Sequence, residues 1–319
     1  MKKNKLLLTM ALAILFSCKK ETKVESSDKE RAGKTYSGTA ATLSYTPVYY
    51  TSRDTIRFTR PDDTYWLSNF RSDFGNDMDR DGNPSITDDE KTRMRTYGNT
   101  FRTTMLPNLL SGAGGQTSSA KLGASASKTL TYDVRFGDSF TGFEWVKGGK
   151  LFGLAGGRAY AGGECTNAGD GWSARVMWHR YSSAYGGKAY LSPYVYYAGS
   201  PCAPGSTVAY GNEFDAQYFG NDGTGLKVNT WYRIKIEVSV NTSNSTANGI
   251  LKVSVQDKTA SGWTSPVTFI NKTNLLYATV NVGRTVDFLY TGIFRGGNDS
   301  TYYSIGSTNI YIDNVAWSN

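Results

Sequence analysis

Residues 232–240 read YRIKIEVSV, in which large apolar side chains alternate with polar ones. A period of two is typical of a β-strand with one buried and one solvated face. The same alternation recurs in residues 129–136 (TLTYDVRF), 250–255 (ILKVSV) and 309–315 (NIYIDNV). These runs are short and are bounded by Gly, Asn, Asp and Ser. They therefore predict an all-β fold, an antiparallel β-sandwich of the jelly-roll type.

No long stretch keeps a helical period. Residues 87–96 are expected to form one short helix, because Asp88, Asp89 and Glu90 favour its first turn. The aromatic segment 64–74 (TYWLSNFRSDF) belongs with the same core. We therefore expect residues 36–319 to form a single domain.

The N-terminus has the features of an export signal. Basic residues precede a short apolar run at residues 6–16, and Cys18 follows it. The run is too short to span a bilayer, so residues 1–17 are predicted to be a lipoprotein signal peptide. Cys18 is then the lipidated first residue, and residues 18–35 are a flexible tether. The alternative is an ordinary secretory signal with an incidental cysteine. Either signal places the chain outside the cytoplasm; with the lipid, it is anchored in the periplasm or at the cell surface.

Two cysteines remain beyond Cys18. Cys165 and Cys202 form an even pair in an oxidising compartment, and we expect a disulfide between them. Two separate thiols are the alternative, because sequence does not bring their Cα atoms within bonding range.

The formal net charge of +8 gives a modest basic excess. Such an excess helps to attract a polyanion, although a solvated basic surface without function has the same composition. No nucleic-acid-binding motif occurs, so nucleic acid is not an expected partner. We expect the protein to be a monomer.

An acidic segment at residues 77–82 resembles the start of an EF-hand calcium loop. Asp77, Asp79 and Asp81 occupy alternate positions, and Gly follows at the sixth. The spacing then departs from the motif, because Pro84 intrudes and position twelve is Asp88 rather than Glu. A structural calcium site and a solvated acidic turn are the two interpretations.

Residues 143–157 (FEWVKGGKLFGLAGG) carry two lysines in an apolar, aromatic run. Lys147 and Lys150 bracket a glycine pair, and such a pair indicates a bulge or kink that re-aims the following side chains. In residues 171–178 (GWSARVMW), Ser173 and Arg175 share one strand face. Arginine beside a hydroxyl can hold a carboxylate, although an exposed sheet face has the same pattern.

Residues 190–197 (YLSPYVYY) place Tyr194 and Tyr196 on one face. Paired phenols can stack on sugars, pack in a core or transfer protons. The only histidine, His179, excludes a multi-histidine metal cluster. By alternation, His179 shares a strand face with Arg175. It is either a lone general base or a residue at the edge of the cleft that takes no part in the chemistry. The sequence contains no G-x-S-x-G turn, so a serine hydrolase of that kind is not indicated.

The blocks KGGKLFGLAGG, GWSARVMW, the Tyr-x-Tyr strand, FRGGN (residues 294–298) and YIDNV (residues 311–315) resemble polysaccharide lyase family 14. The resemblance runs from about residue 129 to the C-terminus. That family contains alginate and polyglucuronate lyases with a β-jelly-roll fold. The resemblance implies that its active residues fall on Lys150 (or Lys147), Ser173, Arg175, Tyr194 and Tyr196.

Two features depart from the family pattern. Phe152 stands where the family commonly has Pro, and the segment between Arg175 and Tyr194 is longer than usual. The longer segment leaves the choice of tyrosine open among Tyr185, Tyr190, Tyr194 and Tyr196.

We therefore expect a polysaccharide lyase that cleaves a polyuronate, alginate or glucuronan, by β-elimination. Arg175 and Lys150, assisted by Ser173, neutralise the uronate carboxylate, and a tyrosine acts as base and acid. Nearby cations are expected to lower the pKa of that phenol. No metal or organic cofactor is required. The residues expected to bind substrate are Lys147, Trp178 and His179. A non-catalytic glycan-binding surface lipoprotein is the alternative, and an adhesion domain is a third.

Overall fold

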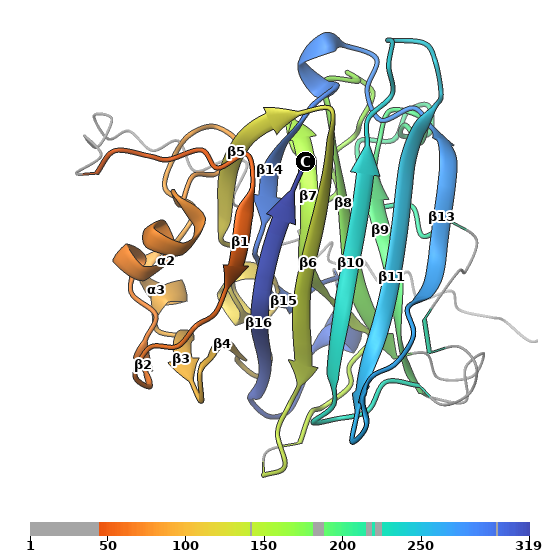
Figure 1. Ribbon diagram of the computed structural model, residues 1–319. Coiled ribbons are helices and arrows are strands. Elements are labelled where there is room, and N and C mark those ends of the chain that lie inside the picture. The colour runs from red at the N-terminus through yellow and green to blue at the C-terminus, as the bar shows by residue number, and fades with distance from the viewer. Residues whose placement is uncertain (1–44, 141, 181–187, 215–218, 221–224, 298) are drawn as a thin grey trace, which may run out of the picture.

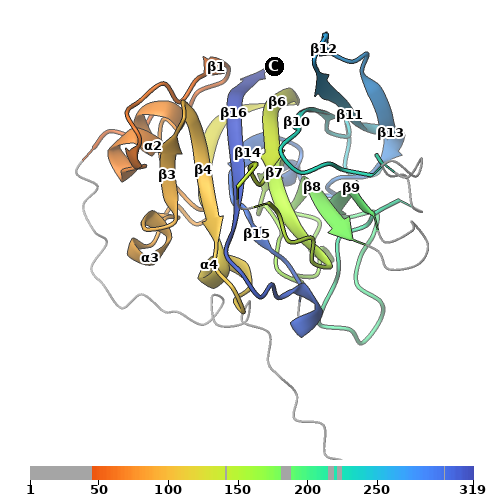
Figure 2. The same cartoon turned by 90° about the horizontal axis from the view of Figure 1, so that it is seen from below.

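The structure is a computed structural model, and it describes residues 45–319 except 141, 181–187, 215–218, 221–224 and 298. The predicted signal peptide, Cys18 and the tether lie outside the described residues, and so does Tyr185. Two antiparallel sheets stack on each other (Figure 1). Figure 2 shows them from below, with β8 and β9 in one layer and β10 and β11 in the other.

The larger sheet has ten strands in the described part of the chain, in the order β12-β11-β10-β6-β16-β4-β3-β2, with β1 paired to β16 and β13 to β11. Its strands are β1 (Arg53–Ile56), β2 (Asp63–Thr64), β3 (Met94–Tyr97), β4 (Thr100–Met105), β6 (Ser127–Phe136), β10 (Trp231–Ser239), β11 (Gly249–Thr259), β12 (Gly262–Trp263), β13 (Val267–Leu275) and β16 (Thr308–Ser318).

The smaller sheet has six strands among the described residues, in the order β5-β14-β7-β8-β9, with β15 paired to β7. These strands are β5 (Ser119–Ser125), β7 (Gly148–Gly157), β8 (Gly171–Arg180), β9 (Ala189–Tyr196), β14 (Val286–Tyr290) and β15 (Phe294–Arg295). The four strands expected from alternation are present as β6, β10, β11 and β16. The prediction of an all-β jelly-roll sandwich is confirmed.

The helices are short: α2 (Leu67–Phe74), α3 (Asp88–Lys91), α4 (Ser111–Gly114) and the 3-10 turns η1 (Asn281–Gly283) and η2 (Ser300–Tyr302). Helices α2 and α3 lie at one side of the sandwich (Figure 1). The predicted short helix is present only over residues 88–91, as α3, which starts with a reciprocal capping box between Thr87 and Glu90. Residues 94–96, which were predicted to continue it, belong to strand β3 instead. None of the helices in the described part is long and apolar enough to cross a bilayer.

One apolar core fills the space between the sheets. It extends from Ile56 to Trp317 and includes Phe70 and Phe74 of α2. The Phe74 ring stacks on Trp317 with centroids 6.3 Å apart. The aromatic segment at residues 64–74 therefore joins the core, as expected, and it does so as a helix that its sequence pattern did not predict.

The acidic segment forms a turn in which the three carboxylates have separate surroundings. Asp77 is buried and forms an ion pair with Arg71, with Nε and Oδ1 2.7 Å apart. Asp79 accepts hydrogen bonds from the main-chain N–H groups of Asp81 and Asn83 at 2.9 and 2.8 Å. The Asp81 side chain is 70% exposed. Within the described ranges no group of three or more His, Cys, Asp or Glu residues is placed to hold a metal ion, so the EF-hand-like spacing does not produce a calcium cage there.

Candidate active site

The candidate site lies on the outer face of the six-stranded sheet, on β7, β8 and β9. Alternation along β8 sends four side chains into the core: Trp172, Ala174, Val176 and Trp178. The intervening residues of β8 therefore face outward. In register with them on β9, Ser173 pairs with Tyr196, Arg175 with Tyr194, and His179 with Tyr190.

Strand β7 contains the predicted bulge. Lys150 lies opposite Met177, whereas Gly153 lies opposite Arg175, so the register shifts between these two pairs. A Cβ atom on residue 153 would lie only 2.7 Å from both Cα and Cγ of Arg175. Glycine at this position therefore makes room for the Arg175 side chain.

Lys150 is a nearly buried cation held between two aromatic rings. The residue is 8% exposed. Its Nζ lies 5.0 Å from the ring centroid of Tyr194 and 5.3 Å from that of Phe294. Phe294 comes from β15, which pairs with β7 directly opposite Lys150. These contacts fix the ammonium group over the phenol of Tyr194.

Arg175 is a buried cation that donates hydrogen bonds to two main-chain oxygens of the described chain. Its Nε donates to the Leu151 carbonyl at 2.9 Å, and its Nη2 donates to the Gly292 carbonyl at 2.6 Å. The guanidinium carbon lies 5.2 Å from the ring of Phe294 and 4.9 Å from that of Tyr290. Lys150 and Arg175 thus share one aromatic neighbour.

Burial lowers the pKa of Arg175 to about 10, so the guanidinium stays charged at neutral pH. Among the described residues, no carboxylate forms an ion pair with Arg175. Buried charges in proteins are normally paired, because desolvation is otherwise uncompensated. The site therefore holds a cation whose missing partner is an anion.

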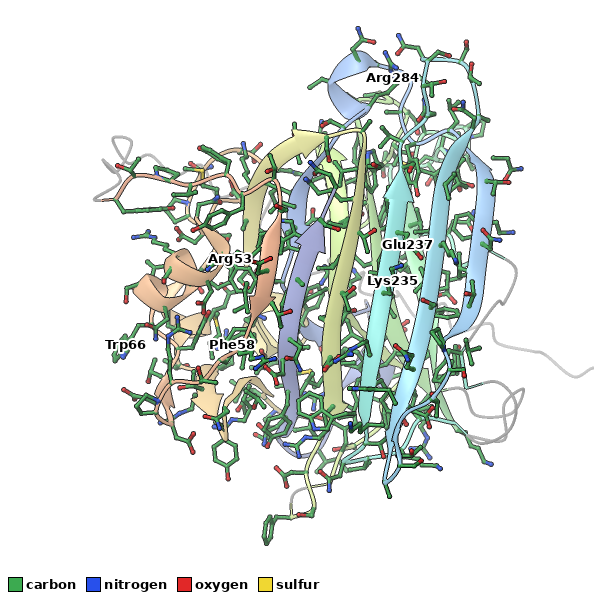
Figure 3. All side chains as sticks on the ribbon, in the orientation of Figure 1. Arg53, Phe58, Trp66, Lys235, Glu237 and Arg284 are labelled. Carbon is green, nitrogen blue, oxygen red and sulfur yellow. A yellow bond between two sulfur atoms is a disulfide. The ribbon has the colours of Figure 1, made fainter. Side chains whose placement is uncertain are left out.

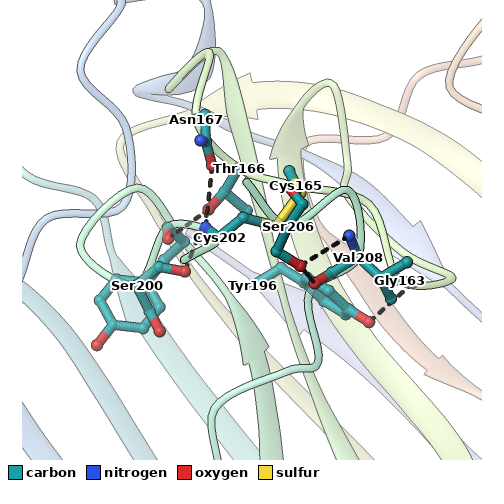
Figure 4. Close-up of a disulfide and its surroundings, with 10 residues drawn as sticks. Gly163, Cys165, Thr166, Asn167, Tyr196, Ser200, Cys202, Ser206 and Val208 are labelled. Atoms are coloured by element: carbon teal, nitrogen blue, oxygen red, sulfur yellow. Dashed lines mark hydrogen bonds between the residues drawn. A yellow bond between two sulfur atoms is a disulfide. The ribbon is translucent and has the colours of Figure 1, made fainter. Parts of the chain in front are cut away.

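Tyr194 and Tyr196 form a pair of phenols beside the two cations. Their hydroxyl oxygens are 3.3 Å apart, and the Gly163 N–H donates to the Tyr196 oxygen at 3.1 Å (Figure 4). Burial raises the pKa of Tyr194, although the hydrogen bonds from Tyr196 and from the main chain of Gly211 act in the opposite direction. The expectation of a lowered pKa is therefore wrong for Tyr194, because desolvation outweighs the donated hydrogen bonds.

Ser173 is in the expected row, but its hydroxyl hydrogen is already engaged. The Oγ donates to the Tyr160 carbonyl at 2.6 Å, and the residue is 1% exposed. Its bond ties β8 to the loop that carries Gly163. In this arrangement Ser173 positions the loop that contacts Tyr196, rather than presenting a free donor to a ligand.

His179 stacks on Tyr190 with ring centroids 5.2 Å apart, and its Nε2 lies 3.6 Å from Glu213 Oε1. Burial lowers the pKa of His179 to about 4, so the imidazole is neutral at pH 7. A group with so low a pKa is a weak base. This environment disfavours His179 as the group that removes a carbon-bound proton.

The other two predicted substrate-binding residues have different neighbours from those of Lys150 and Arg175. Lys147 is exposed, with its Nζ 3.6 Å from Asp299 Oδ2 and 4.9 Å from the Tyr302 ring. Trp178 is 0% exposed and packs on Phe136 and Phe143, with centroids 5.8 and 6.2 Å away. Trp178 is therefore a core residue, because it points to the opposite side of β8 from Arg175. The prediction that Trp178 binds a sugar is wrong.

The predicted disulfide between Cys165 and Cys202 is present, with Cα atoms 5.3 Å apart. It joins the loop after β7 to the loop after β9 (Figure 4). Asn167 Oδ1 accepts a hydrogen bond from the Cys202 N–H at 2.9 Å, which further fixes the junction. The covalent link thereby holds the loop of Gly163 next to the end of β9, where Tyr196 lies.

Two aromatic residues complete the site and were not predicted as members of it. Phe294 belongs to the FRGGN block, so its ring was within a motif but had no assigned role. Tyr290 lies on β14, and its hydroxyl donates to the Ala159 carbonyl. Neither residue is near β8 in sequence, and only the strand order brings them to Arg175.

A family model described as polysaccharide lyase 14 matches residues 99–315. No curated protein matches the chain. Among solved structures, alginate lyase Aly36B is 26% identical with a TM-score of 0.69, over 85% of this chain and 98% of that one. A mutant of it in complex with alginate tetrasaccharide gives 25% identity, a TM-score of 0.70 and coverage of 85% and 98%. The PL-14 alginate lyase from Aplysia kurodai is similar in fold, at 19% identity, a TM-score of 0.57 and coverage of 86% and 99%.

Proposed function

The chain belongs to polysaccharide lyase family 14, and from that premise we propose that it cleaves polyuronates, alginate above all, by β-elimination. The observation that carries this proposal is the buried Arg175 guanidinium, which has no carboxylate partner in the described chain and lies next to Lys150 and Tyr194. A uronate carboxylate supplies the missing anion. The solved alginate lyases at 25–26% identity support the same substrate class.

Neutralisation of the carboxylate is the first requirement of the reaction. Elimination removes the proton on C5, next to the carboxylate, and an ionised carboxylate resists more negative charge beside it. Lys150 and Arg175 offset that charge from one face of the sheet. Because both are largely removed from water, their effect on the developing charge is stronger than at an exposed surface.

Tyr194 is the proposed base. Its oxygen receives hydrogen bonds from Tyr196 and from the main chain of Gly211, and both favour the phenolate. The phenolate takes the C5 proton, the C5–H electron pair forms the C4–C5 double bond, and the C4–O4 bond breaks. Protonated Tyr194, or Tyr196 beside it, returns a proton to O4. No water is consumed, and no metal or organic cofactor takes part in this scheme.

We further propose that lipid on Cys18 anchors the exported protein to a membrane. The proposal rests on the basic and apolar segments before Cys18 and on the polar tether after it. Cys18→Ala should move the protein from the membrane fraction to the soluble fraction. Membrane retention of that variant would contradict lipid anchoring at this residue.

The activity is tested with a panel of purified polymers: polymannuronate, polyguluronate, glucuronan and a neutral glucan. The proposal predicts rising ultraviolet absorbance, from unsaturated sugar ends, with one or more uronates and none with the glucan. Retention of the polymers without cleavage of any would instead identify a non-catalytic glycan-binding protein, and the lyase proposal would be wrong.

A further inference from the structure

A second concave site lies on the opposite face of the sandwich, on the outer side of the ten-stranded sheet. We call it the outer groove: a cavity of about 380 Å³ lined by Gly98, Asn99, Thr100, Asp133, Trp231, Arg233, Lys258, Trp263, Asp313 and Asn314. This sheet face is turned to the viewer in Figure 1, and no helix of the described chain crosses it. Lys235 and Glu237 mark the same face on β10 in Figure 3.

Two tryptophans give the outer groove aromatic walls. Trp231 and Trp263 are both partly exposed. The Arg233 guanidinium carbon lies 4.4 Å from the Trp263 ring centroid, and Lys258 Nζ lies 5.2 Å from it. The C–H face of a sugar ring packs on such rings, while hydroxyl and carboxylate groups reach the polar atoms beside them.

The floor of the outer groove is polar and partly unsatisfied. Arg233 forms a two-pronged ion pair with buried Asp133, at 2.7 and 2.8 Å, so these two charges offset each other. By contrast, Oδ1 of Asp313 is buried and has no hydrogen-bond partner in the described chain. A buried acceptor without a donor costs free energy, so the floor of the groove carries a polar group that the fold leaves incompletely compensated.

The backbone is also unusual at this floor. The register between β16 and β6 shifts between Asp313 and Ala316, and Asn314 has a φ of 51°. A bulge with a non-glycine residue in the left-handed region re-aims side chains at a cost in strain, and such features cluster at binding sites. Here the bulge directs the Asn314 side chain to Asp133, where its Nδ2 donates to Oδ2 at 2.8 Å.

A row of arginines and aromatic rings borders the outer groove. Strand pairing places Trp231 beside Arg135, Arg135 beside Tyr311, Tyr311 beside Arg102, and Arg102 beside Arg95. The Arg135 guanidinium carbon lies 4.2 Å from the Tyr311 ring and 5.2 Å from the Trp231 ring.

The three arginines of this row, Arg95, Arg102 and Arg135, form no ion pair with a carboxylate of the described residues. The nearby Asp138 accepts the hydroxyl hydrogen of Tyr311 at 2.6 Å. The row therefore adds positive charge next to a groove whose own charged pair is neutralised. A charged, aromatic surface of this kind suits a sugar chain that carries negative groups.

From these observations we propose that the outer groove and its arginine row form a second, non-catalytic binding site for an acidic oligosaccharide segment. The choice of a uronate as ligand rests on the proposed function, whereas the existence of a second site does not. On a long polymer, the site holds one segment on the face opposite the cations of the active site. It thereby raises the local concentration of substrate chain without entering the chemistry.

The direct test is migration through native gels that contain alginate, in a Lys150→Met background that does not cleave the polymer. Adding Trp231→Ala and Trp263→Ala should weaken retardation, with the dissociation constant rising about tenfold, as expected from the loss of two aromatic contacts. The matched control is Lys235→Ala, which removes a charge on the same sheet face outside the outer groove and should leave retardation unchanged. Equal retardation of the double tryptophan variant and its parent would overturn the inference.

A second variant guards against misfolding of the first. Arg135→Gln removes the positive charge and leaves a polar side chain, and it should weaken retardation in alginate gels more at low salt than at high salt. Circular dichroism and thermal unfolding check that each variant is folded. Gels with neutral dextran should retard none of the proteins, and retardation there equal to that in alginate would refute an acidic ligand.

The result of the binding test can be distinguished from the result of the test for lyase activity. If the wild-type protein cleaves no uronate but the tryptophan variants lose retardation, the lyase proposal fails and the second site stands. If the wild type cleaves alginate and the tryptophan variants are retarded like their parent, only the second site fails. With Lys150 intact, the double variant should keep kcat/KM on short oligosaccharides and lose several-fold on polymer.

Discussion

The Lys150 ammonium lies 5.0 Å from the ring centroid of Tyr194, and Tyr194 is paired across the sheet with Arg175. Three groups with complementary chemistry are thus fixed on three adjacent strands. Arg175 is buried and has no carboxylate partner in the described chain, and Lys150 lies over the ring of Tyr194. Burial raises the pKa of Tyr194. Under the proposed mechanism, the two cations neutralise the substrate carboxylate next to the phenol that acts as the base.

Lys150→Met should reduce kcat/KM on alginate by about 10²–10³-fold, because it removes one charge that stabilises the developing negative charge. The side chain keeps its length, so the fold should be intact by circular dichroism. Lys235→Met on the opposite face is the charge-matched control and should retain wild-type activity. A Lys150→Met enzyme with wild-type kcat/KM would remove this lysine from the mechanism.

The two tyrosines should differ in importance. Tyr194→Phe removes the proposed base and should lower kcat by about 10²–10⁴-fold. Tyr196→Phe removes a hydrogen bond to the phenolate and the contact with Gly163, and should cost about tenfold. Single-turnover measurements on a defined oligosaccharide check the chemical step. A larger loss in Tyr196→Phe than in Tyr194→Phe would reverse the assignment.

The activity should rise with pH across the neutral range. Burial raises the pKa of Tyr194, so the phenolate is the minor form at pH 7, and its fraction grows tenfold per pH unit below that pKa. Arg175, with a pKa of about 10, stays charged over the same range. We therefore expect log kcat/KM to increase with a slope near +1 between about pH 6 and 8. A flat profile over this interval would argue against a phenolate base.

Loss of the disulfide should affect both stability and activity. Cys165 and Cys202 are 37 residues apart, and their removal as a pair of serines should lower the free energy of unfolding by about 2–4 kcal/mol. Because the link holds the loop of Gly163 at Tyr196, kcat should fall several-fold as well. Urea unfolding and steady-state kinetics measure the two effects. Unchanged kcat in a destabilised double variant would show that the loop does not depend on the link.

Local patterns predicted the strands and much of the site. Alternation along β8 and β9 put Arg175, Tyr194 and Tyr196 on single strand faces, and the register then brought those faces together. The glycine pair at residues 148–149 predicted a bulge, which occurs just after the pair, between residues 150 and 153. Period-two side-chain geometry is local, so the sequence is sufficient to predict it.

Other parts of the site depend on contacts that no local pattern contains. Tyr290 and Phe294 reach Arg175 through the strand order β14-β7-β8 and the pairing of β15 with β7. The partner of the Ser173 hydroxyl is a carbonyl on a loop, and burial rather than nearby cations sets the direction of the Tyr194 pKa. Trp178 could have been placed in the core from alternation alone, because it shares parity with Trp172.

The most direct test of the central claim is to count the ends produced when the purified wild-type protein acts on alginate. β-Elimination predicts one unsaturated end, seen by ultraviolet absorbance, for every new reducing end. New reducing ends without unsaturated ends would show hydrolysis. That result would contradict the proposed mechanism, in which Lys150 and Arg175 neutralise the uronate carboxylate while Tyr194 removes the proton on C5.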